Sequence, residues 1–276
     1  MSTKTKTHSV AAIRRFVHLL VAGALLSGFA YGEPGQKPPG KALDATDNGK
    51  IADKIDKARQ DDDASIYYVE QIAEAKAVQA VPMLEEKFVR TKNHLDKAHI
   101  ASALVRLGDR NEIYWDYLVK LAGWVIDAPG LYSYDSQGKM VPGSGQQFIE
   151  WAKAHSLSPT EIGEWPQYWI AGPVGLLGMT GDPRAVPVLR RGLLSPNHMV
   201  EIFAAKGLAE IGDEGSVPFM IEACKRAPPD AATAIAMSLV YFDDPKAQEA
   251  VDKYLPKQAA KLEREDRARG KKPFGD

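Results

Sequence analysis

The chain has 276 residues and a net charge of −1, from 35 basic and 36 acidic side chains, so nothing in its charge favours nucleic-acid binding. Its composition, 45% apolar and 26% charged, is that of a soluble globular protein and excludes a mostly disordered chain or a polytopic membrane protein. A single cysteine excludes an intramolecular disulfide framework and any thiolate zinc cluster.

Residues 1–32 have the pattern of a cleaved secretory signal peptide. Their basic residues are Lys4, Lys6, Arg14 and Arg15, and they contain no acidic residue. The apolar run from Phe16 to Ala30 is short for a membrane span, which needs about 20 residues. We expect cleavage before Glu33, export to the periplasm or out of the cell, and no stable membrane insertion afterwards; retention of the segment as an anchor is the alternative. Cleavage leaves 31 basic and 36 acidic residues, a net charge of −5.

The rest of the chain is predicted to form three segments. Residues 33–49 are rich in proline and glycine, which favours a flexible linker. Residues 50–256 carry internal repeats with one insertion, at about residues 124–165. Residues 257–276 form a charged C-terminal tail, in which the nearly all-polar run from Ala259 to Arg269 predicts a solvated capping helix that frays. A basic contact of this tail with a membrane or an acidic partner is the alternative.

The repeats are marked by two short patterns that recur at a fixed distance. A small residue, valine, proline and two apolar residues occur at 80–84, 185–189 and 216–220. An apolar ending that closes with aspartate, preceded by glycine in all but the last, occurs at 104–109, 177–182, 208–213 and 239–244. Asp182, Asp213 and Asp244 are each 31 residues apart, as are Pro187 and Pro218. A fixed period of this length predicts stacked structural repeats.

Each repeat is predicted to consist of two helices. Proline is tolerated in the first turn of a helix, so Pro82, Pro187 and Pro218 mark the starts of first helices. The second helices carry apolar residues at helical spacing, namely Ile100, Ala101, Leu104 and Leu107 in one repeat and Ala204, Ala205, Leu208 and Ile211 in another. Glycine, which adopts the left-handed conformation cheaply, ends them.

These residues and their spacing resemble the HEAT-like repeat family, in particular the short bacterial units related to those of phycobilisome lyases. The resemblance covers about residues 50–256 and implies an all-α fold, an α-solenoid of antiparallel helix pairs that usually holds another protein. Lyase activity is not implied, because the chain has no residue set that would carry bilin attachment and such repeats serve many unrelated roles.

Every tryptophan of the chain lies between Asp109 and Asp182, the stretch that contains the insertion. Asp109 and Asp182 are 73 residues apart where one repeat needs 31, so about 42 residues are inserted. Residues 127–139 have the composition of a loop or short hairpin, and residues 146–155 that of a short helix. Because tryptophan and tyrosine are enriched at binding hot spots, we expect the following partner-binding anchors: Trp124, Tyr132, Tyr134, Trp151 and Trp165. The alternative is that these rings pack on one another as a small satellite core.

The sequence indicates no catalytic or metal site. His94 and His198 lie at matching places in their repeats, but both lack the adjacent His-Glu pattern that holds iron in some HEAT-like hydroxylases. Nucleophile-elbow, metalloprotease and phosphate-loop motifs are absent from the sequence. We therefore expect no cofactor and no metal, and Cys224 is expected to be a buried small apolar residue.

We predict an exported, non-catalytic scaffold that binds a protein through the insertion and the concave face of the repeats. The competing hypothesis is a carbohydrate-binding or hydrolytic protein that uses the aromatic insertion as a pocket. The carboxylates that could serve such a pocket are Asp127, Asp135, Glu150, Glu161 and Glu164. A structural component of the cell envelope without a specific ligand is the third hypothesis.

Overall fold

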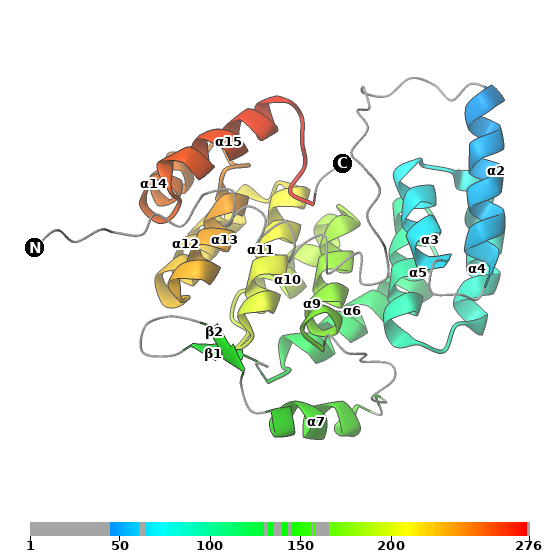
Figure 1. Ribbon diagram of the computed structural model, residues 1–276, viewed down its shortest axis with the longest axis horizontal. Coiled ribbons are helices and arrows are strands. Elements are labelled where there is room, and N and C mark those ends of the chain that lie inside the picture. The colour runs from blue at the N-terminus through cyan, green and yellow to red at the C-terminus, as the bar shows by residue number, and fades with distance from the viewer. Residues whose placement is uncertain are drawn as a thin grey trace, which may run out of the picture. The chain divides into compact units, whose positions relative to one another are not determined.

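The computed structural model describes residues 45–60, 65–129, 132–134, 140–142, 145–155, 157 and 166–274 (Figure 1). The predicted signal peptide and most of the predicted linker lie outside these residues. The chain divides into two compact units, whose described parts are residues 45–121 and 122–274. None of the described helices is long and apolar enough to cross a membrane.

The described residues of the unit 45–121 form five α-helical segments. They are α2 (Ala45–Arg59), α3 (Ser65–Glu74), α4 (Val81–Arg90), α5 (His94–Arg106) and the first part of α6 (Glu112–Ile126). Helix α2 packs against α3, and α5 packs against both α3 and α4. Phe88 of α4 contacts Tyr114 of α6 edge to face, with ring centroids 4.9 Å apart. Apolar burial between successive helices therefore holds this unit together.

Helix α2 begins inside the segment predicted as a linker. It starts at Ala45, so residues 45–49 are helical and the predicted boundary at residue 49 is wrong. The last proline before this helix is Pro39, and no residue between it and Ala45 forbids helical geometry. The helix therefore extends through weak helix formers, including Gly49, ahead of its apolar positions.

A buried ion pair ties α3 to α5. Glu70 accepts a hydrogen bond from His99 Nδ1 at 2.7 Å and from Arg106 Nη1 at 2.6 Å. Burial disfavours the charged form of Glu70, but the hydrogen bonds and charges of His99 and Arg106 outweigh it and hold its pKa below the usual value. Removal of one member would leave a buried charge unpaired, so the three side chains act as a unit.

The unit of residues 122–274 contains the remaining helices and a short hairpin. In chain order they are β1 (Tyr132–Tyr134), β2 (Met140–Pro142), α7 (Gly145–Ala154), α9 (Pro166–Met179), α10 (Val186–Gly192), α11 (His198–Ile211), α12 (Val217–Arg226), α13 (Pro229–Leu239), α14 (Pro245–Tyr254) and α15 (Lys257–Ala268). Helices α9, α11 and α13 pack against one another in that order, while α10, α12 and α14 each pack against a member of this row (Figure 1). Successive helices joined by short loops run antiparallel, so the predicted all-α architecture of stacked helix pairs is confirmed.

The residues that begin and end the repeat helices are those predicted. Proline occupies the second position of α4, α10 and α12, each of which is preceded by a single 3-10 turn. Gly108, Gly181 and Gly212 close their repeats with positive φ angles of 89°, 65° and 74°. A residue with a side chain would be strained there, which is why glycine recurs at this place.

Helices α9 and α11 approach each other through two glycines. A methyl group built on Gly178 of α9 would lie 2.4 Å from the Cα atom of Gly207 of α11. Carbon atoms that are not bonded prefer separations of about 3.5–4.0 Å, so no side chain fits at this crossing. Phe203 fills the next turn, where it faces Gly175. The glycines therefore set the spacing of the helix pair.

The C-terminal tail caps the last repeat. Asp243 occupies the place of glycine in the last ending, residues 239–244, and α13 stops at Leu239, three residues before the place equivalent to the end of α11. Arg267 of α15 supplies the missing donors: its Nη1 atom donates to the carbonyls of Val240 and Phe242, at 2.9 and 3.4 Å. An arginine from the tail thus replaces the glycine turn as the cap.

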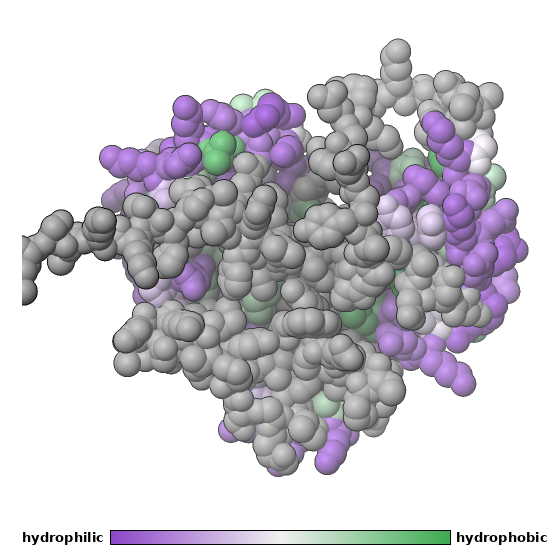
Figure 2. All heavy atoms as spheres, in the orientation of Figure 1, coloured by the Kyte–Doolittle hydropathy of each residue, from purple (hydrophilic) through white to green (hydrophobic). Residues whose placement is uncertain are grey.

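Helix α15 is docked along its length. Its residues Ala260, Glu263 and Asp266 are buried, and Arg264 pairs with Asp252 of α14 at 2.8 Å. Figure 2 shows that the outer surface of α15, at the upper left, is almost entirely hydrophilic. The predicted capping helix is present, and its polar side chains bond to α14 and to the carbonyl of Val240, just after α13.

Candidate partner-binding site

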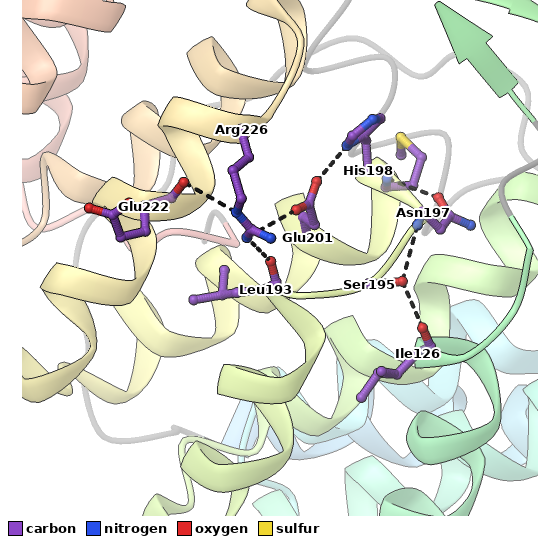
Figure 3. A network of polar contacts seen from close by, with 9 residues as sticks. Ile126, Leu193, Ser195, Asn197, His198, Glu201, Glu222 and Arg226 are labelled. Carbon is purple, nitrogen blue, oxygen red and sulfur yellow. Dashed lines mark hydrogen bonds and ion pairs between the residues drawn. The ribbon is translucent and has the colours of Figure 1, made fainter.

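The C-terminal end of α6 is fixed to the loop between α10 and α11 (Figure 3). Ser195 Oγ donates a hydrogen bond to the carbonyl of Ile126 at 2.7 Å and accepts one from the backbone N–H of Asn197 at 3.1 Å. Arg191 of α10 donates to the carbonyl of Gly123 at 3.2 Å. These bonds satisfy the last carbonyls of α6, which have no partner within the helix. The segment that carries Trp124 is therefore held by the repeats.

The polar network continues into the start of α11. The buried side chain of Asn197 caps this helix by accepting a hydrogen bond from the N–H of Met199 at 3.0 Å. One turn on, Glu201 is only 3% exposed, and it lies 2.5 Å from His198 Nδ1 and 3.6 Å from Arg226 Nη2. A buried carboxylate needs such partners, so these residues fix the position of the helix start.

Arg226 links this network to the previous helix pair. Its Nη2 atom donates to the carbonyl of Leu193 at 2.8 Å (Figure 3). Cys224, on the same helix, is buried as predicted, and burial together with the Glu201 carboxylate raises the pKa of its thiol to about 12. A thiol with such a pKa is not a nucleophile at neutral pH. The loop, the helix start and α12 therefore form a structural joint rather than a reactive site.

Two of the predicted anchors meet on either side of a histidine. The rings of Trp124 and His155 have centroids 5.1 Å apart, and those of Trp151 and His155 4.7 Å apart. His155 Nδ1 lies 2.8 Å from the carbonyl of Trp151, one turn earlier on the same chain segment, so this nitrogen carries the proton. We call these three residues the Trp124–Trp151 cluster. All three are half-buried, so each keeps part of its ring surface accessible.

The other predicted anchors are placed only in part. Tyr132 and Tyr134 lie on β1, opposite Pro142 and Met140 of β2, so the predicted hairpin is present. Trp165 lies outside the described residues. The short helix predicted at residues 146–155 is α7, and the structure brings its Trp151 together with Trp124 from α6.

The histidines considered as metal ligands have other partners. His94 Nδ1 lies 2.8 Å from the hydroxyl of Tyr117, and His198 pairs with Glu201. Within the part of the chain that the structure describes, no three histidine, cysteine, aspartate or glutamate side chains gather in a way that could hold a metal ion. The arrangement therefore supplies aromatic contact surface and structural polar bonds.

The carboxylates considered for a sugar pocket are only partly described. Asp127 lies 3.6 Å from Arg191 and is largely exposed. Glu150 is exposed on α7, and Asp135, Glu161 and Glu164 fall outside the described residues. No carboxylate pair across a substrate position follows from these contacts.

Sequence reasoning missed the residues that position the cluster. His155 follows Trp151 by four residues on a predicted helix, a spacing that places two side chains on one face, so a signal was present. Ser195 and Asn197 stand just before a helix start, where such residues cap, but their bond to α6 spans 69 residues and left no local signal.

Part of the helical structure that holds this site matches a known family. Residues 174–240, which include α10, α11, α12 and α13, match the HEAT repeats family. No curated protein matches the chain. The matched stretch contains the joint that holds α6, namely Ser195, Asn197 and Glu201. The match covers residues 174–240, where the 31-residue period and the stacked helix pairs of α10 to α13 agree with HEAT repeats.

Proposed function

We propose that the chain is an exported, non-catalytic scaffold that binds a partner protein through the Trp124–Trp151 cluster and the HEAT repeats that hold it. HEAT repeats commonly hold other proteins, which supports the general role. The observation that carries the proposal is that two half-buried indole rings, from segments 27 residues apart, meet at His155 on a frame fixed by Ser195. Preorganised aromatic side chains of this kind supply much of the binding energy at protein interfaces.

The chemistry of the described site supports a non-catalytic role. The Ser195 hydroxyl bonds to two backbone groups, and the carboxylate of Glu201 faces His198 and Arg226. Nucleophilic catalysis needs a nucleophile beside a base that accepts its proton, and the bonds of Ser195 are made to backbone groups.

Export is proposed on the pattern of residues 1–32. Amino-terminal sequencing of the protein from its native cells tests it directly. A mature chain that begins at Glu33 in the periplasmic or secreted fraction supports export. A chain that retains Met1 contradicts cleavage.

Partner binding is tested by capture from native envelope extract with a tagged full-length chain. We expect the Trp124→Ala, Trp151→Ala double variant to bind the partner at least about 30-fold more weakly than the wild type, because loss of even one hot-spot ring costs about 2 kcal/mol or more. Val89→Ala is the control, since it truncates an apolar side chain that is 77% exposed on α4, in the unit that does not contain the cluster. Circular dichroism of each variant shows that the fold is retained.

The competing carbohydrate hypothesis is tested with the same variants. Each described tryptophan ring of the cluster reports its surroundings through its fluorescence, so a glycan that binds there would change the emission. A saturable change with a glycan, lost in the double variant, would contradict protein binding as the role of this cluster. Equal partner capture by the folded double variant and the wild type would also contradict it.

A further inference from the structure

The last described residues of the chain fold back onto the HEAT repeats. Two residues after helix α15 ends at Ala268, Gly270 adopts a φ of 84° that reverses the chain, and the N–H of Lys271 bonds to the carbonyl of Asp266 at 3.1 Å. Lys272 is also held, because the Tyr241 hydroxyl of the last repeat donates a hydrogen bond to the Lys272 carbonyl at 3.3 Å. Residues 271–274 therefore run along the repeats as a short docked strap.

The strap ends on an aromatic contact with α9 and α11. The Phe274 ring lies 6.4 Å from the ring of Phe203, centroid to centroid. A methyl group on Gly178 would stand 3.5 Å from the Phe274 ring, so the glycine leaves room for it. The ammonium group of Lys206 lies 5.4 Å from the ring centroid, a cation–π distance. We call the surface formed by Gly178, Phe203, Lys206 and Glu210 the tail slot.

The charged end of the tail slot is Glu210. Its side chain is only 8% exposed, and its Oε1 atom lies 2.8 Å from Lys272 Nζ. Its other oxygen, Oε2, is buried and accepts no hydrogen bond from any residue that the structure describes. A buried acceptor without a donor is costly, so the slot holds an unused place for an N–H group.

The chain's own strap fits this slot incompletely. Lys272 is 68% exposed, and an exposed lysine contributes little to an ion pair. Its ammonium group meets one carboxylate oxygen, whereas an arginine guanidinium can donate two parallel hydrogen bonds to both oxygens. Pro273 and Phe274 lie in a turn, which brings the basic residue and the aromatic ring onto the same surface. The slot therefore fits a short segment with a basic residue two positions before an aromatic one.

We propose that the tail slot is the docking site for a short segment of a partner protein in which an arginine stands two residues before an aromatic residue, and that residues 271–274 cover the slot until this segment displaces them. The inference rests on the proposed protein-binding function and adds a second contact surface to it. Displacement is feasible because the strap competes only through its tethered concentration, which for a short flexible connection is about millimolar.

The test uses a fluorescent peptide with the sequence of residues 268–276 and the full-length chain. Phe274→Ala empties the aromatic part of the slot, and we expect this variant to bind the peptide about tenfold more tightly than the wild type does. The peptide with arginine at the position of Lys272 is expected to bind about fivefold more tightly than the original, and the peptide with alanine at the position of Phe274 about tenfold more weakly. Lys271→Ala is the control, because Lys271 contacts Asp266 of α15 and not the slot.

A second readout keeps the wild-type sequence. In the full-length chain with 4-fluorophenylalanine at position 274, addition of the arginine peptide is expected to move the fluorine resonance to that of a free tail. Two results would overturn the proposal: no peptide binding by a folded Phe274→Ala chain, or equal affinity of wild type and variant. A peptide-sensitive dimer of the wild type in sedimentation would also overturn it, since the occupant would then be a second copy. The titration needs no native partner, so its failure is separable from failure of partner capture at the Trp124–Trp151 cluster.

Discussion

Substitution of Gly178 by alanine tests the close crossing of α9 and α11. The added methyl group would stand 2.4 Å from the Gly207 Cα atom, at least about 1 Å inside a normal carbon–carbon contact, so the two helices must separate. Overpacking of this kind costs about 1–3 kcal/mol. Alanine regains at most about 1 kcal/mol of helix propensity over glycine, and less near the helix end at Met179. We expect a net loss of about 1–2 kcal/mol.

The assay is chemical and thermal unfolding followed by far-ultraviolet circular dichroism. For a unit of this size the loss corresponds to a fall in Tm of about 2–8 °C. Gly49→Ala is the control, because Gly49 lies in α2 with no atom within 4 Å of the added methyl group, and we expect it to stabilise by up to about 1 kcal/mol. If Gly178→Ala unfolds at the same denaturant concentration as the wild type or a higher one, the helices do not cross at this distance.

Three further predictions concern the polar contacts. Arg267→Ala removes the side-chain donor to the carbonyl of Val240, just after α13, while Gln248 still donates to the carbonyl of Phe242. We expect this variant to cost about 1–2 kcal/mol in urea unfolding, against about 0.5 kcal/mol for the more exposed Arg264→Ala; equal losses would refute the capping role. Glu70→Gln breaks a buried ion pair and is expected to cost about 3 kcal/mol at pH 7. Because the folded pKa of Glu70 is lowered, its contribution is lost as pH falls below about 4.3, so the variant should lose less stability than the wild type in that range; parallel pH profiles would contradict this. Burial lowers the pKa of Lys206 to about 8 in the folded chain. Between about pH 8 and 10 the unfolded chain therefore binds more protons than the folded chain, and the free energy of unfolding rises with pH. Lys206→Met should remove this rise, and a rise of the same size in the variant would rule out Lys206 as its source.

The repeats could be predicted because their signals are local. Pro187 and Gly212 act within one turn of chain, proline by lacking an N–H and glycine by reaching a positive φ, so their spacing alone placed α10 and the end of α11. The buried face of α11 followed from helical periodicity, and Ala204, Ala205 and Leu208 are fully buried as expected. Ile211, the last residue of the pattern, is only half-buried because the helix ends there.

The contacts that position the candidate site could not be predicted from local sequence signals. The bond of Ser195 to the carbonyl of Ile126 joins residues 69 positions apart, so it depends on the three-dimensional course of the insertion between them. No sequence pattern near either residue predicts that course. The strap is a similar case, because Phe274 meets Phe203 of α11 across 71 residues. An isolated aromatic residue in a charged tail was the one signal that could have pointed to it.

The most direct test of partner binding by the Trp124–Trp151 cluster is hydrogen exchange of the chain with and without its captured partner. We expect the partner to slow exchange in α7 and in the last turns of α6, the two elements that carry the cluster rings. Unchanged exchange in both elements, with partner bound and protection found elsewhere on the described chain, would contradict the assignment of this cluster as the binding site.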